Sequence, residues 1–365
     1  MVGGEAEDRG GEQWIFTEEA LAGARAAAQD CAARALQSSV ADGGERRASS
    51  REPPRPLGLE EGLRLVLFYA RKVPELCDLC EAPADVRWTA AMFYRRFFAV
   101  RSPMEFDPLP LMFACVHAAC KVEEVHEITL ERLLAAADLS ADESLKARVV
   151  RFELPLLEGL GFGLLVEPKP HTALGMLAEE LRAKRPASLA ALQDDGWREA
   201  LARAESLVLQ MAVRSDAVLR WPISVVIAAA LGATLDARIS HPSDDRANAP
   251  SQLSLALLQS SLEADEQKKA IAGMYAGVVH CIQQLASEPE LTEDAVKETV
   301  KNARKCHRAF ERLRELATES NEAQRKERKR RLSEVKGASQ RVPTPMLRDL
   351  MEFNRRMQAG SGSAA

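Results

Sequence analysis

Helical segments separated by short polar breaks recur along this sequence, and strand patterns are nearly absent. The segments predict two sets of five helices. The first set covers residues 58–78, 84–100, 108–122, 129–136 and 142–160, and the second covers 170–184, 188–215, 222–237, 250–260 and 265–286. Pro103, Pro108, Asp138 and Gly161 separate segments of the first set. The pattern therefore predicts an all-α protein in which a five-helix unit occurs twice.

Further segments flank the two sets. Thr17, followed by two glutamates, predicts the start of an Ala-rich helix that runs to about Ser39. Residues 41–57 combine Gly, Ser, Arg and Pro with little apolar content, which predicts a flexible linker. A charged helical pattern follows Thr292 and ends in a basic run. The final GSGSAA predicts a disordered tail.

Length and composition are those of an ordinary globular protein. The chain has 365 residues, of which 46% are hydrophobic, and a formal net charge of -5. This charge gives no overall attraction for nucleic acid or for an anionic membrane. The N-terminus has no signal-peptide pattern, and no apolar run reaches the length of about 20 residues that spans a bilayer. We expect an intracellular, soluble protein whose seven cysteines are reduced and mostly buried.

Catalytic and metal-binding motifs are missing from the sequence. It contains no GxxxxGK[ST], GxGxxG, GxSxG or HExxH pattern. Cys77 and Cys80 form a CxxC pair without a second one, and we interpret them as a buried structural pair. Cys115, His117 and Cys120 lie in one apolar helix and cannot converge on a metal, so His117 is interpreted as a satisfied core histidine. The sequence predicts no catalytic residue, no metal and no cofactor.

One lysine stands at the end of an apolar helix. Residues 108–120, PLPLMFACVHAAC, are apolar almost all round and predict a fully buried helix, and Lys121 follows directly. The spacing alone favours an interaction of Lys121 with the C-terminal end of its own helix, which contributes about 0.3–1 kcal/mol. Glu153 is then a residue of a solvated helix face.

Three stretches around this lysine resemble the first box of the cyclin family. They are MFYRRFF at 92–98, PLMFACVHAACKVEEVHEITLERLL at 110–134 and FELPLLEGLGFGLLVEPKP at 152–170. The third stretch has in register Glu153, Leu157, Leu160, Phe162, Leu164 and Val166. The resemblance implies two five-helix cyclin boxes and a kinase-binding site that includes Lys121, Glu124 and Glu153.

The sequence departs from the cyclin pattern at two prolines. Lys169 occupies the closing proline position, with Pro168 and Pro170 on either side, which predicts a turn shifted by one residue. Pro155 lies two residues after Glu153, where it removes the helix bond to the carbonyl of Arg151 and predicts a kink that costs about 3 kcal/mol.

The flanks resemble one cyclin subfamily. W-x-F-T-x-E at 14–19 and K-C-H-R-A at 305–309 are similar to the cyclins H, regulatory subunits of the CDK-activating kinase. The resemblance spans residues 13–331 and is strongest in the first box and the flanks. The expected domains are then an N-terminal helix and flexible linker (1–57), a first cyclin box (58–166), a second cyclin box (167–288), and a C-terminal helix with a basic run and a disordered tail (289–365).

The resemblance implies a nuclear kinase activator that is not itself an enzyme. Its partners would be a cyclin-dependent kinase, the catalytic subunit of the CDK-activating kinase, together with a RING-bearing assembly factor and general transcription factor IIH. No direct contact with nucleic acid and no membrane contact are expected. Another transcriptional cyclin, or a cyclin-fold transcription factor that binds nucleic acid, remains an alternative, and an enzyme is the least favoured.

Three other features have two interpretations each. Trp14 and Phe16 are either an exposed hydrophobic staple at a helix entrance, worth about 1 kcal/mol, or anchors that pack the terminal helix and contact the partner. The basic run is either a solvated helix end or a nuclear localisation cluster of Arg325, Lys326, Arg328, Lys329, Arg330 and Arg331. The run LRLVL at 63–67 loosely resembles a cyclin substrate-docking patch, but such a stripe is usually core.

Overall fold

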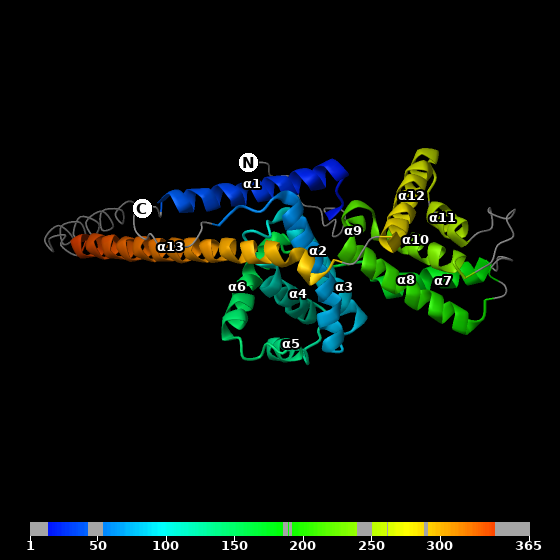
Figure 1. Cartoon of the computed structure of the whole chain (residues 1–365), viewed down its shortest axis with the longest axis horizontal. Helices are drawn as coiled ribbons and strands as arrows, with labels where there is room; N and C mark the ends of the chain where they lie inside the picture. The colour runs from blue at the N-terminus through cyan, green and yellow to red at the C-terminus, as the bar shows by residue number, and fades with distance from the viewer. Residues whose placement is uncertain are drawn as a thin grey trace, which may run out of the picture. The chain divides into compact units, whose positions relative to one another are not determined.

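The computed structural model describes residues 14–42, 54–184, 189, 192–238, 250–260, 262–287 and 291–339. The chain divides into two compact units, Met1–His307 and Arg308–Ala365. Over the described ranges, the ordered elements longer than one turn are all α-helices, which confirms the predicted class (Figure 1). None of these helices is long and apolar enough to cross a bilayer.

The first five helices after the N-terminal helix form a bundle, here called the first bundle. It consists of α2 (Leu59–Leu79), α3 (Ala84–Val100), α4 (Pro108–Val122), α5 (Leu130–Ala136) and α6 (Glu143–Gly159). Helix α4 packs against α2, α3, α5 and α6. Because its sequence is apolar on nearly every side, α4 is stable only at the centre of the bundle. Asp107 caps its N-terminus by accepting a 3.1 Å hydrogen bond from the Leu109 amide.

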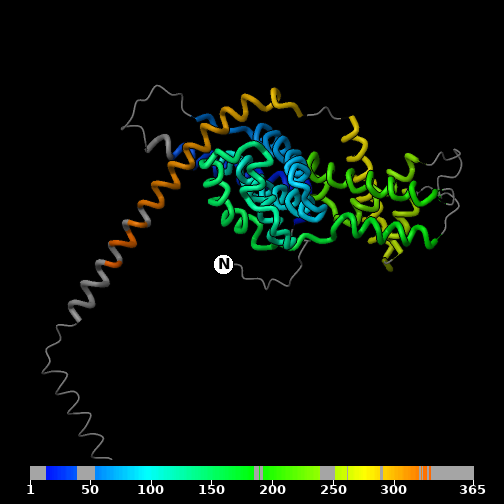
Figure 2. Tube along the Cα trace, turned by 90° about the horizontal axis from the view of Figure 1, so that it is seen from below, coloured from blue at the N-terminus to red at the C-terminus, as the bar shows by residue number. Residues whose placement is uncertain are grey.

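The second bundle follows directly and lies beside the first (Figure 2). It consists of α7 (Pro170–Lys184), α8 (Asp194–Arg214), α9 (Ala217–Arg220), α10 (Ile223–Asp236), α11 (Pro250–Ser260) and α12 (Asp265–Ser287). Helix α10 is its buried centre and packs against α7, α8, α11 and α12. Helix α8 also contacts α2 and α3, so it joins the two bundles.

Two expectations for this part of the chain were wrong. The helix predicted over 188–215 begins at Asp194, where two aspartates favour the positive end of the helix dipole. Helix α9 was not predicted, because four residues are too short to show a helical period.

The N-terminal helix α1 (Glu18–Asp42) lies along the first bundle and contacts α2 and α3. Thr17 caps it as predicted, because its Oγ1 accepts a 3.2 Å hydrogen bond from the Ala20 amide. Trp14 is 7% exposed and packs near Arg96, whose guanidinium lies 5.7 Å from the ring centre. Of the two interpretations, this burial fits a Trp14 that packs the terminal helix and not an exposed staple, and Phe16 is partly buried against the core.

The last residues of the predicted linker are also packed. Leu57 is buried, and its carbonyl accepts a 2.7 Å hydrogen bond from Gln29 Nε2 on α1. The carbonyl of Arg55 accepts a 2.8 Å bond from Asn302, on the last helix, α13 (Glu293–Ser339). The prediction of a flexible linker over 41–57 is therefore wrong for residues 55–57. Its residues 43–53 lie outside the described residues, as does the tail GSGSAA.

Several helices end in a left-handed residue that is not glycine. Glu81, Glu124 and Asp138 have φ of 55°, 58° and 56°. At each end the next amide bonds a carbonyl five residues back, as from Val125 to Cys120 at 2.8 Å. This is the Schellman motif, in which a side chain costs about 1–2 kcal/mol more than glycine. These helices are thus terminated by backbone hydrogen bonds and not by a glycine at the left-handed position.

The cysteines fit the predicted reduced state. All seven are free, and Cys77 and Cys80 are buried. Burial raises the pKa of the Cys77 thiol to about 12. Within the described part of the chain, no group of acidic, histidine or cysteine side chains could hold a metal ion.

Candidate functional site

Lys121 and Glu153 meet on the surface of the first bundle. Lys121 Nζ donates a 2.7 Å hydrogen bond to Glu153 Oε1, which joins the last turn of α4 to the middle of α6. The two side chains are 55% and 35% exposed. Spacing alone had favoured a lysine that interacts with the C-terminal end of its own helix and a glutamate on a separate solvated face. The structure instead joins the two side chains by a hydrogen bond.

Helix α6 continues through Pro155. The helix runs to Gly159, so the proline does not move Glu153 away from α4. A Cβ atom added to Gly159 would lie 2.5 Å from the Phe97 ring. This glycine therefore allows α6 to approach α3 closely at the end that follows Glu153.

His117 faces the same carboxylate one turn before Lys121. Its Nδ1 lies 3.2 Å from Glu153 Oε1, and its side chain is 18% exposed. Burial and the neighbouring charge of Lys121 lower the pKa of His117, while Glu153 acts in the opposite direction. His117 is thus a half-buried neighbour of the pair and not the core histidine that the sequence suggested.

The first glutamate after Lys121 has a role that sequence reasoning missed. Glu123 accepts a 2.6 Å hydrogen bond from Thr89 Oγ1 and pairs with Lys169, which also bonds Thr89 at 2.8 Å. Lys169 is therefore held in this cluster, which accounts for a lysine at the expected proline position. The signal available in the sequence was Lys169 itself, which stands where the cyclin pattern has a proline.

Glu124, by contrast, is an exposed residue. It follows α4 in the left-handed conformation described above. The structure thus brings Lys121 and Glu153 together, and Glu124 lies exposed three residues after Lys121.

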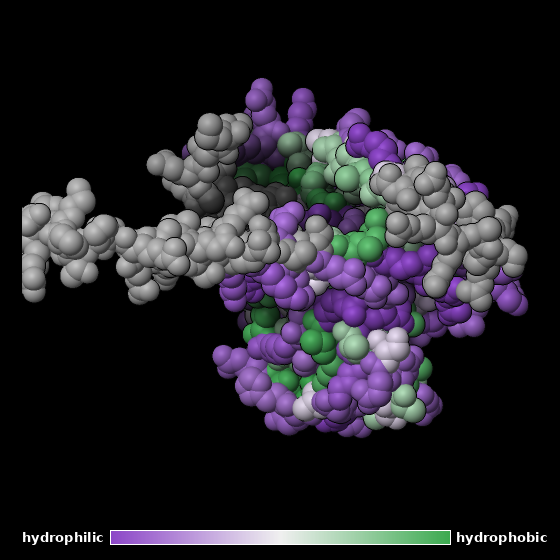
Figure 3. Space-filling model, turned by 90° about the vertical axis from the view of Figure 1, so that its left-hand side faces the viewer, coloured by the Kyte–Doolittle hydropathy of each residue, from purple (hydrophilic) through white to green (hydrophobic). Residues whose placement is uncertain are grey.

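Exposed apolar side chains lie on α6, near Glu153 in sequence, and in the segment that follows the helix. Val150 lies one turn before Glu153 on α6 and Leu154 directly follows Glu153, and the two apolar side chains are 54% and 58% exposed. Phe162 and Leu165, in the segment after α6, are 64% and 63% exposed. Figure 3, which views the side on which α6 lies in Figure 1, shows green apolar surface among hydrophilic residues. We call Val150, Leu154, Phe162 and Leu165 the apolar surface; exposed apolar groups that adjoin a charged pair are typical of a protein-binding site.

The remaining sequence features lie elsewhere. In the run LRLVL, Leu65 and Val66 are buried, so this stripe is mainly core. Of the basic run, Arg325, Lys326 and Lys329 are exposed on α13, whereas the side chains of Arg328, Arg330 and Arg331 lie outside the description.

Curated proteins similar to this chain include several cyclins. Cyclin CCL1 of Saccharomyces cerevisiae is 38% identical over 110 residues, which are 30% of this chain and 26% of that protein. Cyclin-H1-1 of Arabidopsis thaliana is 31% identical over 112 residues, 31% of this chain and 32% of that protein. The chain thus matches about a third or less of the length of these relatives. No protein-family model matches it.

A solved structure extends the likeness over most of the chain. One chain of the CAK complex from Chaetomium thermophilum bound to ATP-γ-S has a TM-score of 0.65 at 19% identity. The match covers 86% of this chain and 93% of that one. At this identity the likeness shows a shared fold.

Proposed function

We propose, from the premise that the chain has the cyclin fold and is similar to the cyclins H, that it binds and activates a cyclin-dependent kinase. It would push the regulatory helix of the kinase inward, so that a helix glutamate pairs with the lysine that holds the ATP phosphates. The chain then supplies position rather than catalysis, and its role is that of a regulatory subunit.

The observation that carries this proposal is the Lys121–Glu153 pair beside the apolar surface. Lys121 has donors, and Glu153 acceptor positions, beyond those used in their mutual bond. Both can therefore bond backbone groups of a partner helix while Val150 and Leu154 lose contact with water. A charge-assisted bond contributes about 1.5–3 kcal/mol, so the pair would set the register of an otherwise apolar contact. Glu124 is proposed to lie at the edge of this interface.

The wider assembly is proposed from the likeness to the cyclins H. The kinase would be the catalytic subunit of the CDK-activating kinase, joined by a RING-bearing assembly factor within general transcription factor IIH. The location would be the nucleus, and the exposed cations Arg325, Lys326 and Lys329 of the basic run support a nuclear localisation role.

Affinity capture of the full chain from a nuclear extract tests the proposal. The expected result is a bound cyclin-dependent kinase, whose activity on a peptide substrate rises when purified chain is added back. A matched capture with Lys121→Glu should recover less of that kinase. Capture of the same kinase without activation would contradict the proposal. The proposal would also be contradicted if the chain captured no kinase and instead bound DNA with an affinity that falls steeply with salt. That result would indicate a nucleic-acid-binding protein of the same fold.

A further inference from the structure

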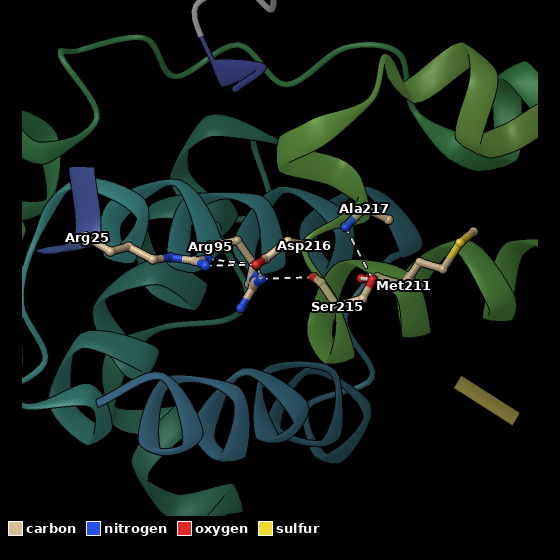
Figure 4. A network of polar contacts seen from close by, with 6 residues as sticks. All are labelled: Arg25, Arg95, Met211, Ser215, Asp216 and Ala217. Carbon is tan, nitrogen blue, oxygen red and sulfur yellow. Dashed lines mark hydrogen bonds and ion pairs between the residues drawn. The ribbon is translucent and has the colours of Figure 1, made fainter. Parts of the chain in front are cut away.

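Asp216 joins three parts of the chain that are far apart in sequence. It lies between α8 and α9 of the second bundle and accepts two hydrogen bonds from Arg25 of α1, at 2.8 and 2.7 Å. Its Oδ1 also accepts a 2.5 Å bond from Arg95 of α3, in the first bundle. Figure 4 shows both guanidinium groups directed at this one carboxylate.

The charges at this junction depend on one another. Arg95 is 1% exposed, and Asp216 is 28% exposed. Burial lowers the pKa of Arg95 and Asp216 opposes that change. Burial alone would raise the pKa of Asp216, but the hydrogen bonds from Arg25 and the charge of Arg95 lower it to about 2. Asp216 is therefore ionised at neutral pH and shared between α1 and α3.

The start of α1 makes two more contacts with α9. The Phe16 amide donates a 2.8 Å hydrogen bond to the carbonyl of Leu219. Arg220 Nη2 lies 2.7 Å from Glu18 Oε2. The first turns of α1 are thus bonded to the second bundle at three places along α9 and its cap.

The rest of α1 is bonded to the first bundle. Gln29 Nε2 donates to the carbonyl of Leu57, and Gln29 Oε1 accepts a 2.6 Å hydrogen bond from Ser102. Gln29 is 7% exposed, so these bonds are shielded from water. One rigid helix therefore carries contacts to both bundles, spaced along its length.

We propose that the segment 16–25 is a strap that fixes the orientation of the second bundle on the first, with Asp216 as its anchor. Helix α8 also joins the bundles by packing on α2 and α3. Such packing holds two bundles together but permits small rotations, as helix interfaces slide past one another. The strap removes that freedom because its bonds to Leu219 and Arg220 add fixed contacts to those of α8.

The test uses the full chain with the side-chain contacts of the strap removed from α1. The variant Glu18→Ala/Arg25→Ala leaves Arg95 bonded to Asp216, so no buried cation loses its partner. The matched control is Glu19→Ala/Arg34→Ala, which removes the same residue types from exposed positions of the same helix. Far-ultraviolet circular dichroism establishes that both variants keep their helix content. If the double variant loses helix content, the single variant Arg25→Ala is used in its place, provided that its own helix content is kept.

Distance measurement between paired spin labels reports the orientation directly. Labels at Ser144→Cys in α6 and Ala202→Cys in α8 lie at exposed positions of different bundles, and Cys31→Ser removes the exposed native thiol. We expect a narrow distance distribution for the parent and the control, and a broad or shifted one for the strap variant. A strap variant with the parent's distribution would overturn the proposal and show that α8 packing is sufficient.

A second measurement relates the strap to the proposed kinase activation and rests on that function. The strap variant should need more chain for half-maximal kinase activation than the control does. A broadened distance distribution with unchanged activation would leave the strap established and separate from the kinase. A parent chain that activates no kinase would overturn the proposed function and leave the distance result standing.

Discussion

Lys121 Nζ lies 2.7 Å from Glu153 Oε1, although the two residues are 32 positions apart in the sequence. The contact places a cation from α4 and an anion from α6 in one surface patch beside exposed apolar side chains. Because both groups are partly exposed, the bond adds little to the stability of the fold. Its value is expected to lie in the recognition of a partner.

Reversal of the charge at Lys121 should therefore weaken kinase binding more than it weakens the fold. We expect Lys121→Glu to lower the affinity for the kinase by about 2 kcal/mol or more, while the free energy of unfolding falls by less than about 1 kcal/mol. Lys146→Glu is the matched control, because Lys146 forms a similar 2.9 Å pair with Glu131 in the same bundle. Calorimetric titration and urea unfolding check the two effects. Equal kinase affinity for both variants would show that Lys121 is not part of the interface.

Replacement of Glu124 by glycine separates backbone strain from binding. Glu124 has φ of 58°, so we expect Glu124→Gly to stabilise the protein by about 1 kcal/mol. Glu81→Gly should stabilise it similarly, because Glu81 holds the same position after α2. Urea unfolding measures both. If Glu124 contacts the kinase as proposed, only Glu124→Gly lowers activation, and an unchanged activation would exclude that contact.

Neutralisation of Asp216 should destabilise the native state strongly. In Asp216→Asn, the buried guanidinium of Arg95 faces an amide instead of a carboxylate. A buried charge without its partner costs about 3 kcal/mol or more. Arg25→Ala should cost less, since Arg95 keeps its bond to Asp216. Chemical unfolding of the two variants gives the comparison, and equal losses would show that Arg95 does not depend on Asp216.

The same carboxylate predicts a dependence of stability on pH. The pKa of Asp216 is about 2 in the folded protein and about 4 in an unfolded chain. A lowered native pKa contributes stability that is complete above about pH 4 and is lost as the pH falls towards 2. We expect the difference in unfolding free energy between the parent and Asp216→Asn to shrink over this range. A difference that stays constant between pH 5 and pH 2.5 would contradict the assigned pairing.

Close packing behind the site gives a fifth prediction. A methyl group at position 159 would overlap the Phe97 ring, so Gly159→Ala should destabilise the protein by about 1–3 kcal/mol. Gly175→Ala in α7 is the control, because no atom lies within 4 Å of its added Cβ. That change should stabilise the helix by up to about 1 kcal/mol. Thermal unfolding should move the two melting temperatures in opposite directions, and a shift of Gly159→Ala towards higher temperature would contradict the packing.

Local patterns predicted most of the helices well. The bounds of α3 and α4 agree with the predicted 84–100 and 108–122, because a proline precedes or starts each helix and apolar residues continue to its end. The pair of Lys121 and Glu153, however, was expected only from resemblance to cyclins. A contact between two helices depends on how they pack, and no spacing within either helix contains that information.

Contacts over long separations were missed for the same reason. Arg95 and Asp216 are 121 positions apart, and Arg25 and Asp216 are 191 apart. In the sequence, Arg25 and Arg95 are ordinary charged residues of helical segments, and Asp216 directly follows the predicted helix over 188–215. For Trp14 the sequence left an exposed staple and a packed anchor both open, because burial before a helix depends on tertiary packing. The polar cluster of Thr89, Glu123 and Lys169 likewise exists only once two helices and the following turn have come together.

The burial of the thiols gives the protein a natural labelling site. Burial raises the pKa values of Cys120 and Cys306 to about 11, so these side chains remain protonated and protected at neutral pH. Cys31, on the outer side of α1, is the exposed one of the seven. A maleimide dye should therefore attach to α1 alone in the native protein, and without any engineered cysteine it would report on the part of this helix that is bonded to the first bundle.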